Sequence, residues 1–97
     1  MTFIEKLNHA SRQNNSLLCV GLDVDVDRIP KFLLAEKDPV GTFNRAIIEA
    51  TADLVCAYKP NVAFYEVLGE EGWRALRQTC QAGRHRQHGS DVCPSLL

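Results

Sequence analysis

The sequence lacks the features that mark several classes of protein. Its longest apolar run, Leu17 to Leu22, is far shorter than the roughly 20 residues that a membrane-spanning helix requires. The formal net charge of −1 offers no basic surface for nucleic acid or an anionic membrane. The first residues lack the apolar segment of a secretory signal. We therefore expect a cytoplasmic protein with no nucleic-acid or membrane partner.

Cysteine is present, but without the spacing of a metal site. The four cysteines form no Cys-x-x-Cys pair. Cys19 and Cys56 fall in apolar segments with strand character, and Cys80 falls on the apolar face of a predicted helix. We expect these thiols to be buried and reduced. His85, His88 and Cys93 are only loosely spaced like ligands, and we expect no metal there.

The chain has the composition of one folded domain, and its local patterns alternate between helix and strand. Of its 97 residues, 45% are hydrophobic and 24% are charged. Thr2 and Glu5 form a capping box for a helix that should end near Asn14. The continuous run 17–22 predicts a strand covered on both faces. A short helix should begin near Pro30.

The second half of the pattern predicts another helix, a strand and a third helix. Asp38 and Pro39 fit the cap and first position of a helix. Its buried face should carry Phe43, Ile47, Ala50 and Leu54. Residues 55–58 then read as a buried strand. A helix beginning near Glu70 and Glu71 should bury Trp73, Leu76 and Cys80 and stop near Gly83.

Two ionisable residues follow the two predicted strands. Asp23 comes directly after the first strand, and Lys59 follows the second, where Pro60 ends it. Strand, helix and strand of this length form a βαβ unit of a barrel or doubly wound α/β fold. Because parallel strands end at the same edge, the two groups should share one site. Asp25 and Asp27 lack the glycine and the terminal glutamate of a calcium loop.

Two longer segments make the sequence similar to one enzyme family. These segments are Phe43-Asn44-Arg45-Ala46-Ile47-Ile48 and Tyr58-Lys59-Pro60-Asn61-Val62-Ala63-Phe64-Tyr65-Glu66. Together with Leu22-Asp23 and Gly72-Trp73, they resemble orotidine 5′-phosphate decarboxylase, most closely its longer bacterial branch. The resemblance covers residues 1–82. It implies an incomplete α/β fold, the N-terminal third of a (β/α)8 TIM barrel.

The resemblance also implies an activity and its residues. The family converts orotidine 5′-phosphate to UMP and CO2 in pyrimidine synthesis, as a homodimer without metal or organic cofactor. Lys59 matches the first lysine of the catalytic charge network, and Asp23 matches the aspartate that binds the ribose. Asn61 and Phe64 are further substrate-binding candidates. For Phe64, and for Tyr65, packing in the core is an equal alternative to a place on the pocket floor.

The last residues depart from the family pattern. The motif Asp-x-Lys-x-x-Asp should follow Ala82, and the sequence does not contain it. That motif supplies the proton-donating lysine, so we expect the chain to be inactive alone. We interpret residues 83–97 as an atypical tail, from a shifted reading frame or a misjoined gene, or as disordered. The alternatives are a non-catalytic homologue that associates with full-length subunits and a sugar-phosphate decarboxylase with the same barrel.

Overall fold

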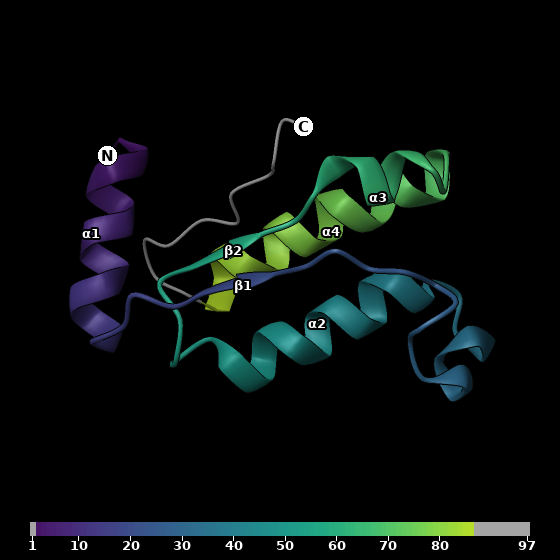
Figure 1. Cartoon of the computed structure of the whole chain (residues 1–97), viewed down its shortest axis with the longest axis horizontal. Coiled ribbons are helices and arrows are strands. Elements are labelled where there is room, and N and C mark those ends of the chain that lie inside the picture. The colour runs from purple at the N-terminus through teal and green to yellow at the C-terminus, as the bar shows by residue number, and fades with distance from the viewer. Residues whose placement is uncertain (1, 87–97) are drawn as a thin grey trace.

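The computed structural model describes residues 2–86, which form a short parallel sheet flanked by helices. The elements follow in the order α1 (Phe3–Asn14), β1 (Cys19–Gly21), the 3-10 helix η1 (Lys31–Ala35), α2 (Pro39–Thr51), β2 (Ala57–Lys59), α3 (Val62–Glu66) and α4 (Glu70–Arg86). In Figure 1 the two strands run side by side at the centre, α2 and α4 extend along them, and α1 stands at one end.

Local signals fix helix α1 as the sequence predicts. The Thr2 side chain accepts a hydrogen bond from the backbone N–H of Glu5, and the Glu5 carboxylate accepts one from the N–H of Thr2. Asn15 ends the helix in the left-handed conformation, with φ of 48°, which asparagine tolerates well. The Asn14 amide then donates to the carbonyls of Ala52 and Val55, and so ties α1 to the chain before β2.

The two strands pair in parallel, which confirms the predicted βαβ unit. Cys19 lies opposite Ala57, and Gly21 lies opposite Lys59. The N–H of Leu22 donates to the carbonyl of Lys59 at 3.2 Å, so pairing continues just beyond the strands. The crossover contains η1 and α2. The carboxyl ends of both strands therefore lie at one edge of the sheet, where residues 22–23 and 59–61 meet.

Helix α2 begins as predicted, and its predicted buried face is confirmed in part, since Phe43 and Ile47 are half-buried and pack against the core. The Asp38 carboxylate accepts from the N–H of Gly41, and Pro39 stands in the first turn. The buried residues of α2 are Val40, Gly41, Asn44 and Ile48, whereas the predicted Ala50 and Leu54 are exposed. The prediction counted only apolar side chains, and so it missed a stripe that has a polar residue at its centre.

Helix α4 differs from its prediction in extent and in orientation. It continues through Gly83 to Arg86, because an interior glycine costs a helix only about 1 kcal/mol. Trp73, predicted to be core, is 47% exposed. The predicted Leu76 is buried, and so is Ala75; both pack with Tyr65 of α3, while the predicted Cys80 is half-buried.

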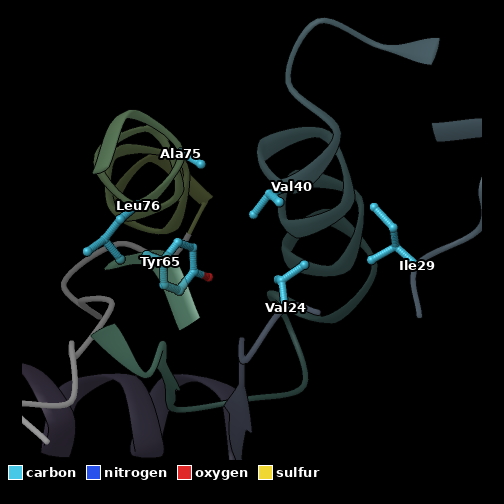
Figure 2. Close-up of a cluster of buried hydrophobic side chains, with 6 residues drawn as sticks. All are labelled: Val24, Ile29, Val40, Tyr65, Ala75 and Leu76. Atoms are coloured by element: carbon cyan, nitrogen blue, oxygen red, sulfur yellow. The ribbon is translucent and has the colours of Figure 1, made fainter. Parts of the chain in front are cut away.

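The main apolar cluster lies between α2, α3 and α4. Figure 2 shows Tyr65 beside Leu76 on the α4 side, and Val24, Val40 and Ile29 around α2. A second cluster joins Leu22, Ile48, Val55 and Tyr58 on the sheet. The core thus lies under the strand ends and holds α3 against the loop that follows β1.

The first strand is less covered than its sequence predicts. Leu17 is 91% exposed, Leu18 is 55% exposed, and Cys19 is exposed, so the expected burial on both faces is wrong for this segment. Among residues 2–86 only β2 pairs with β1, and no helix covers the outer side of Leu17. Cys56 is buried and Cys80 is half-buried, while Cys93 lies outside the described residues.

Candidate functional site

Asp23 and Lys59 lie at the same edge of the sheet, as the sequence predicts. Lys59 is the last residue of β2, and Asp23 stands two residues beyond its partner Gly21. The hydrogen bond from the Leu22 N–H to the Lys59 carbonyl joins the two chain segments at this edge. Both side chains are exposed to solvent. A carboxylate and an ammonium group can therefore reach the same ligand from adjacent strands.

Asn61 holds the Asp23 carboxylate with its backbone and caps α3 with its side chain. The Asn61 N–H donates to Oδ1 of Asp23 at 2.9 Å. Oδ1 of Asn61 accepts from the N–H of Ala63 at 3.1 Å, which makes Asn61 the N-cap of α3. The predicted site residue Asn61 is thus next to Asp23, and its side chain fixes the start of α3.

The aromatic pair on α3 divides between the surface and the core. Phe64 is 40% exposed, whereas Tyr65 is completely buried and belongs to the main apolar cluster. Successive residues of a helix point about 100° apart, so one neighbour faces the core while the other does not. Tyr65 therefore takes the core alternative.

A buried polar network lies beneath this edge, and the sequence did not reveal it. The Tyr65 hydroxyl donates to the carbonyl of Leu22 at 2.6 Å. The Asn44 amide donates to the Tyr65 hydroxyl at 2.8 Å and to the Thr79 hydroxyl at 2.9 Å. Thr79 donates in turn to the carbonyl of Ala75. The network links α2, α3 and α4 to the residue that precedes Asp23.

In this network one oxygen lacks a hydrogen-bond partner and one hydroxyl has a shifted pKa. Oδ1 of Asn44 has no hydrogen-bond partner among residues 2–86, although Asn44 is fully buried. Such an unsatisfied acceptor costs about 1–3 kcal/mol. Burial raises the pKa of Tyr65 to about 12, and the Asp23 charge acts in the same direction. One sequence signal could have revealed this network. Asn44 and Thr79 are polar residues at helical positions that an apolar periodicity would fill with apolar side chains.

The other aspartates after β1 form a turn. The Asp25 carboxylate accepts from the N–H of Asp27, and its carbonyl accepts from the N–H of Arg28. Its ion pair with Arg28, at 3.7 Å, is solvent-exposed and adds little stability. Within residues 2–86 no three metal-ligating side chains gather into a group.

One pocket lies away from the predicted residues. It measures about 120 Å³ and lies between the start of α2 and the start of α4; its lining residues are Val26, Lys37, Asp38, Pro39, Val40, Leu68, Glu71 and Arg74. Asp23, Lys59, Asn61 and Phe64 do not line it. This pocket therefore does not enclose the groups at the edge of the sheet. Across residues 2–86, every helix is too short or too polar to cross a bilayer.

The known proteins that this chain matches in sequence share one name. The chain is 53% identical over 77 residues to the orotidine 5′-phosphate decarboxylase of Christiangramia forsetii, and 56% identical over 77 residues to that of Herpetosiphon aurantiacus. It is 54% identical over 81 residues to the Thermomicrobium roseum enzyme. These matches cover 79–84% of this chain but only 28–29% of each relative. No family model matches the chain.

Solved structures agree with the sequence matches. The Leishmania donovani UMP synthase superposes with a TM-score of 0.71 at 33% identity, over 97% of this chain and 18% of that one. The Leishmania donovani OMP decarboxylase superposes with a TM-score of 0.66 at 34% identity, over 92% of this chain and 30% of that one. The chain is therefore a homologue of the orotidine 5′-phosphate decarboxylases, and it forms a partial α/β fragment of their TIM barrel.

Proposed function

We propose that this chain supplies one part of the active site of an orotidine 5′-phosphate decarboxylase, with Asp23 binding the substrate ribose and Lys59 belonging to the charge network. The observation that carries the proposal is the meeting of Asp23, Lys59 and Asn61 at one edge of the sheet, in a chain 53–56% identical to enzymes of that name. The same names favour the nucleotide substrate over a sugar phosphate.

The geometry of Asp23 suits a hydroxyl ligand. One carboxylate oxygen accepts the Asn61 N–H, which fixes the orientation of the group. The other oxygen, Oδ2, stands above Gly21, 3.9 Å from the position that a Cβ would have there. An oriented, exposed carboxylate accepts hydrogen bonds from vicinal hydroxyls at little reorganisation cost. This is the role that we assign to Asp23.

The role of Lys59 is electrostatic. Decarboxylation leaves negative charge on a ring carbon, and a cation already in place stabilises that charge. Lys59 extends into solvent from the end of β2, where its backbone is held by pairing with β1. A second lysine is needed to donate the proton, and the Asp-x-Lys-x-x-Asp sequence that would supply it is not among the 97 residues. We therefore expect the chain alone to turn over no substrate.

The domain boundary, the assembly and the location follow the same proposal. We assign residues 1–82 to the barrel and set residues 83–97 apart, a division supported by matches that extend over 77–81 residues. Residues 87–97 of that tail lie outside the described structure. The substrate would be orotidine 5′-phosphate, the assembly a homodimer and the location the cytoplasm, as in the family that the chain resembles.

A hybrid enzyme tests the proposal. In the Thermomicrobium roseum decarboxylase, the segment that matches this chain over 81 residues is replaced by the aligned residues of this chain. We call this protein the hybrid enzyme. We expect it to release CO2 from orotidine 5′-phosphate, and Lys59→Ala to lower kcat by at least about a hundredfold. Asp23→Ala should raise KM by at least about tenfold, because one charge-assisted hydrogen bond is lost.

Matched controls separate the site from the surface. Lys31→Ala and Asp53→Ala remove one exposed charge each, from η1 and from the turn after α2. Both should leave kcat and KM unchanged. A folded hybrid enzyme without activity, or equal losses in Lys59→Ala and Lys31→Ala, would refute the proposed function.

A further inference from the structure

The segment Leu22–Asp23 is held by α3 at two points. The backbone N–H of Asn61, at the N-cap of α3, donates to the Asp23 carboxylate at 2.9 Å. One turn further along α3, the Tyr65 hydroxyl donates to the carbonyl of Leu22 at 2.6 Å. That carbonyl belongs to the peptide that connects directly to Asp23. The two contacts together set the position of the backbone and the direction of the side chain.

The Tyr65 hydroxyl is itself held from two other helices. Asn44 of α2 donates to it, and the same amide donates to Thr79 of α4. All three side chains are buried, at 0–2% exposure. A hydroxyl with its donor and acceptor both fixed has one orientation, so the network transmits the packing of α2 and α4 to the edge of the sheet.

The composition of this network indicates a purpose beyond packing. Asn44 leaves Oδ1 without a partner among the described residues, and apolar residues of similar volume would avoid that cost. We interpret a buried polar group that costs stability as one that fixes a particular geometry. The geometry that it fixes here is that of the Leu22 carbonyl, one residue before Asp23.

We propose that Tyr65 is a positioning residue for substrate binding, acting through the Leu22 carbonyl to place the Asp23 carboxylate, with Asn44 and Thr79 holding its hydroxyl. This inference rests on the proposed function, because it assigns Asp23 the ribose. Tyr65 itself is completely buried, so its hydroxyl acts on the site through the Leu22 carbonyl. Its effect should therefore appear in KM far more than in kcat.

Tyr58 provides a matched control for Tyr65. Both tyrosines are completely buried, and each donates its hydroxyl to a backbone carbonyl. The acceptor of Tyr58 is Ile48 on α2, not the segment that leads to Asp23. Tyr58→Phe thus removes the same chemical group and a comparable hydrogen bond from the same core. A purely structural role predicts equal effects for the two substitutions.

The experiment compares the two variants in the hybrid enzyme. We expect Tyr65→Phe to raise KM for orotidine 5′-phosphate by roughly tenfold with little change in kcat, because the hydrogen bond that holds the Leu22 carbonyl is lost. The backbone amide of Asn61 should also exchange with solvent several times faster, because α3 is no longer fixed at Leu22. Tyr58→Phe should lower the melting temperature comparably and leave KM and the exchange of Asn61 unchanged.

The outcomes distinguish this inference from the proposed function. Equal KM values for the two variants would overturn the positioning role, as would equal exchange rates of the Asn61 amide. A folded but inactive hybrid enzyme would refute the function, while the amide comparison would still decide whether Tyr65 fixes the strand end. If Tyr65→Phe fails to fold, Thr79→Val and Thr79→Ser replace it. Thr79→Val should raise KM and Thr79→Ser should restore it, and identical KM values for the two would overturn the proposal.

Discussion

Two regions of the molecule both contain large apolar residues and differ sharply in burial. In the core, Tyr65 between α2, α3 and α4 and Ile48 against the sheet are completely buried. At the start of β1, Leu17 is 91% exposed and Leu18 is 55% exposed. The difference is one of cover, since three helices surround the first region and one strand pairs with the second. The apolar pattern of a sequence indicates which residues can be buried. The neighbouring helices and strands determine which of these residues are buried.

The largest contrast between the regions should come from two glycines. A Cβ on Gly72 would overlap the backbone carbonyl of Tyr65, whose carbon would be 2.8 Å away, and neither backbone can yield. A Cβ on Gly21 would find its nearest atom, Asp23 Oδ2, at 3.9 Å. In the hybrid enzyme we expect Gly72→Ala to lower the free energy of unfolding by about 3 kcal/mol or more. Gly21→Ala should change it by less than about 1 kcal/mol, as measured by urea unfolding. Similar midpoints for the two variants would contradict the close approach of α3 and α4.

Truncating one large apolar side chain in each region should give the same contrast in the loss of stability. Ile48→Ala opens a cavity in the core and should cost about 2–5 kcal/mol. Leu17→Ala removes an exposed side chain and should cost less than about 0.5 kcal/mol if that surface stays exposed. Thermal unfolding of both variants in the hybrid enzyme measures the difference. A large loss of stability for Leu17→Ala in the hybrid enzyme would show that the rest of the barrel covers this segment. The contrast in burial would then apply only to the isolated chain.

The smallest expected effect concerns the buried hydroxyl of Tyr65 and appears only at high pH. Burial raises its pKa from 10.0 to about 12, so the folded state favours the protonated phenol. This contribution is complete below pH 10 and is lost as the pH rises through about 12. The stability advantage of the parent over Tyr65→Phe should therefore shrink by up to about 2–3 kcal/mol across that interval. Unfolding measured at several pH values in both proteins checks this, and a constant difference would contradict it.

Local signals carried much of the prediction. The capping box at Thr2 and Glu5, the Asp38 cap and the parallel pairing of the two strands are confirmed, because each depends on neighbours in sequence or on chain connectivity. The prediction that Asp23 and Lys59 meet follows from the same connectivity. Their roles toward a substrate stay predictions.

Other features depended on contacts between distant elements, and the sequence pattern misjudged them. The buried Asn44 amide donates to hydroxyl acceptors on α3 and α4, and an apolar periodicity cannot register such partners. Trp73 was assigned with Leu76 to the buried side of its helix, but it is 47% exposed, whereas Ala75 and Leu76 are buried.

The sequence by itself determined where α1, α2 and α4 begin, which two strands pair, and which charged residues follow them, since capping, chain connectivity and strand termination are local. Only the tertiary structure decided which face of each helix is buried, that Leu17 stays exposed, and that Tyr65 reaches the carbonyl before Asp23. Those outcomes require atoms from α2, α3 and α4 to meet at distances of a few ångströms, and no local pattern encodes such a meeting.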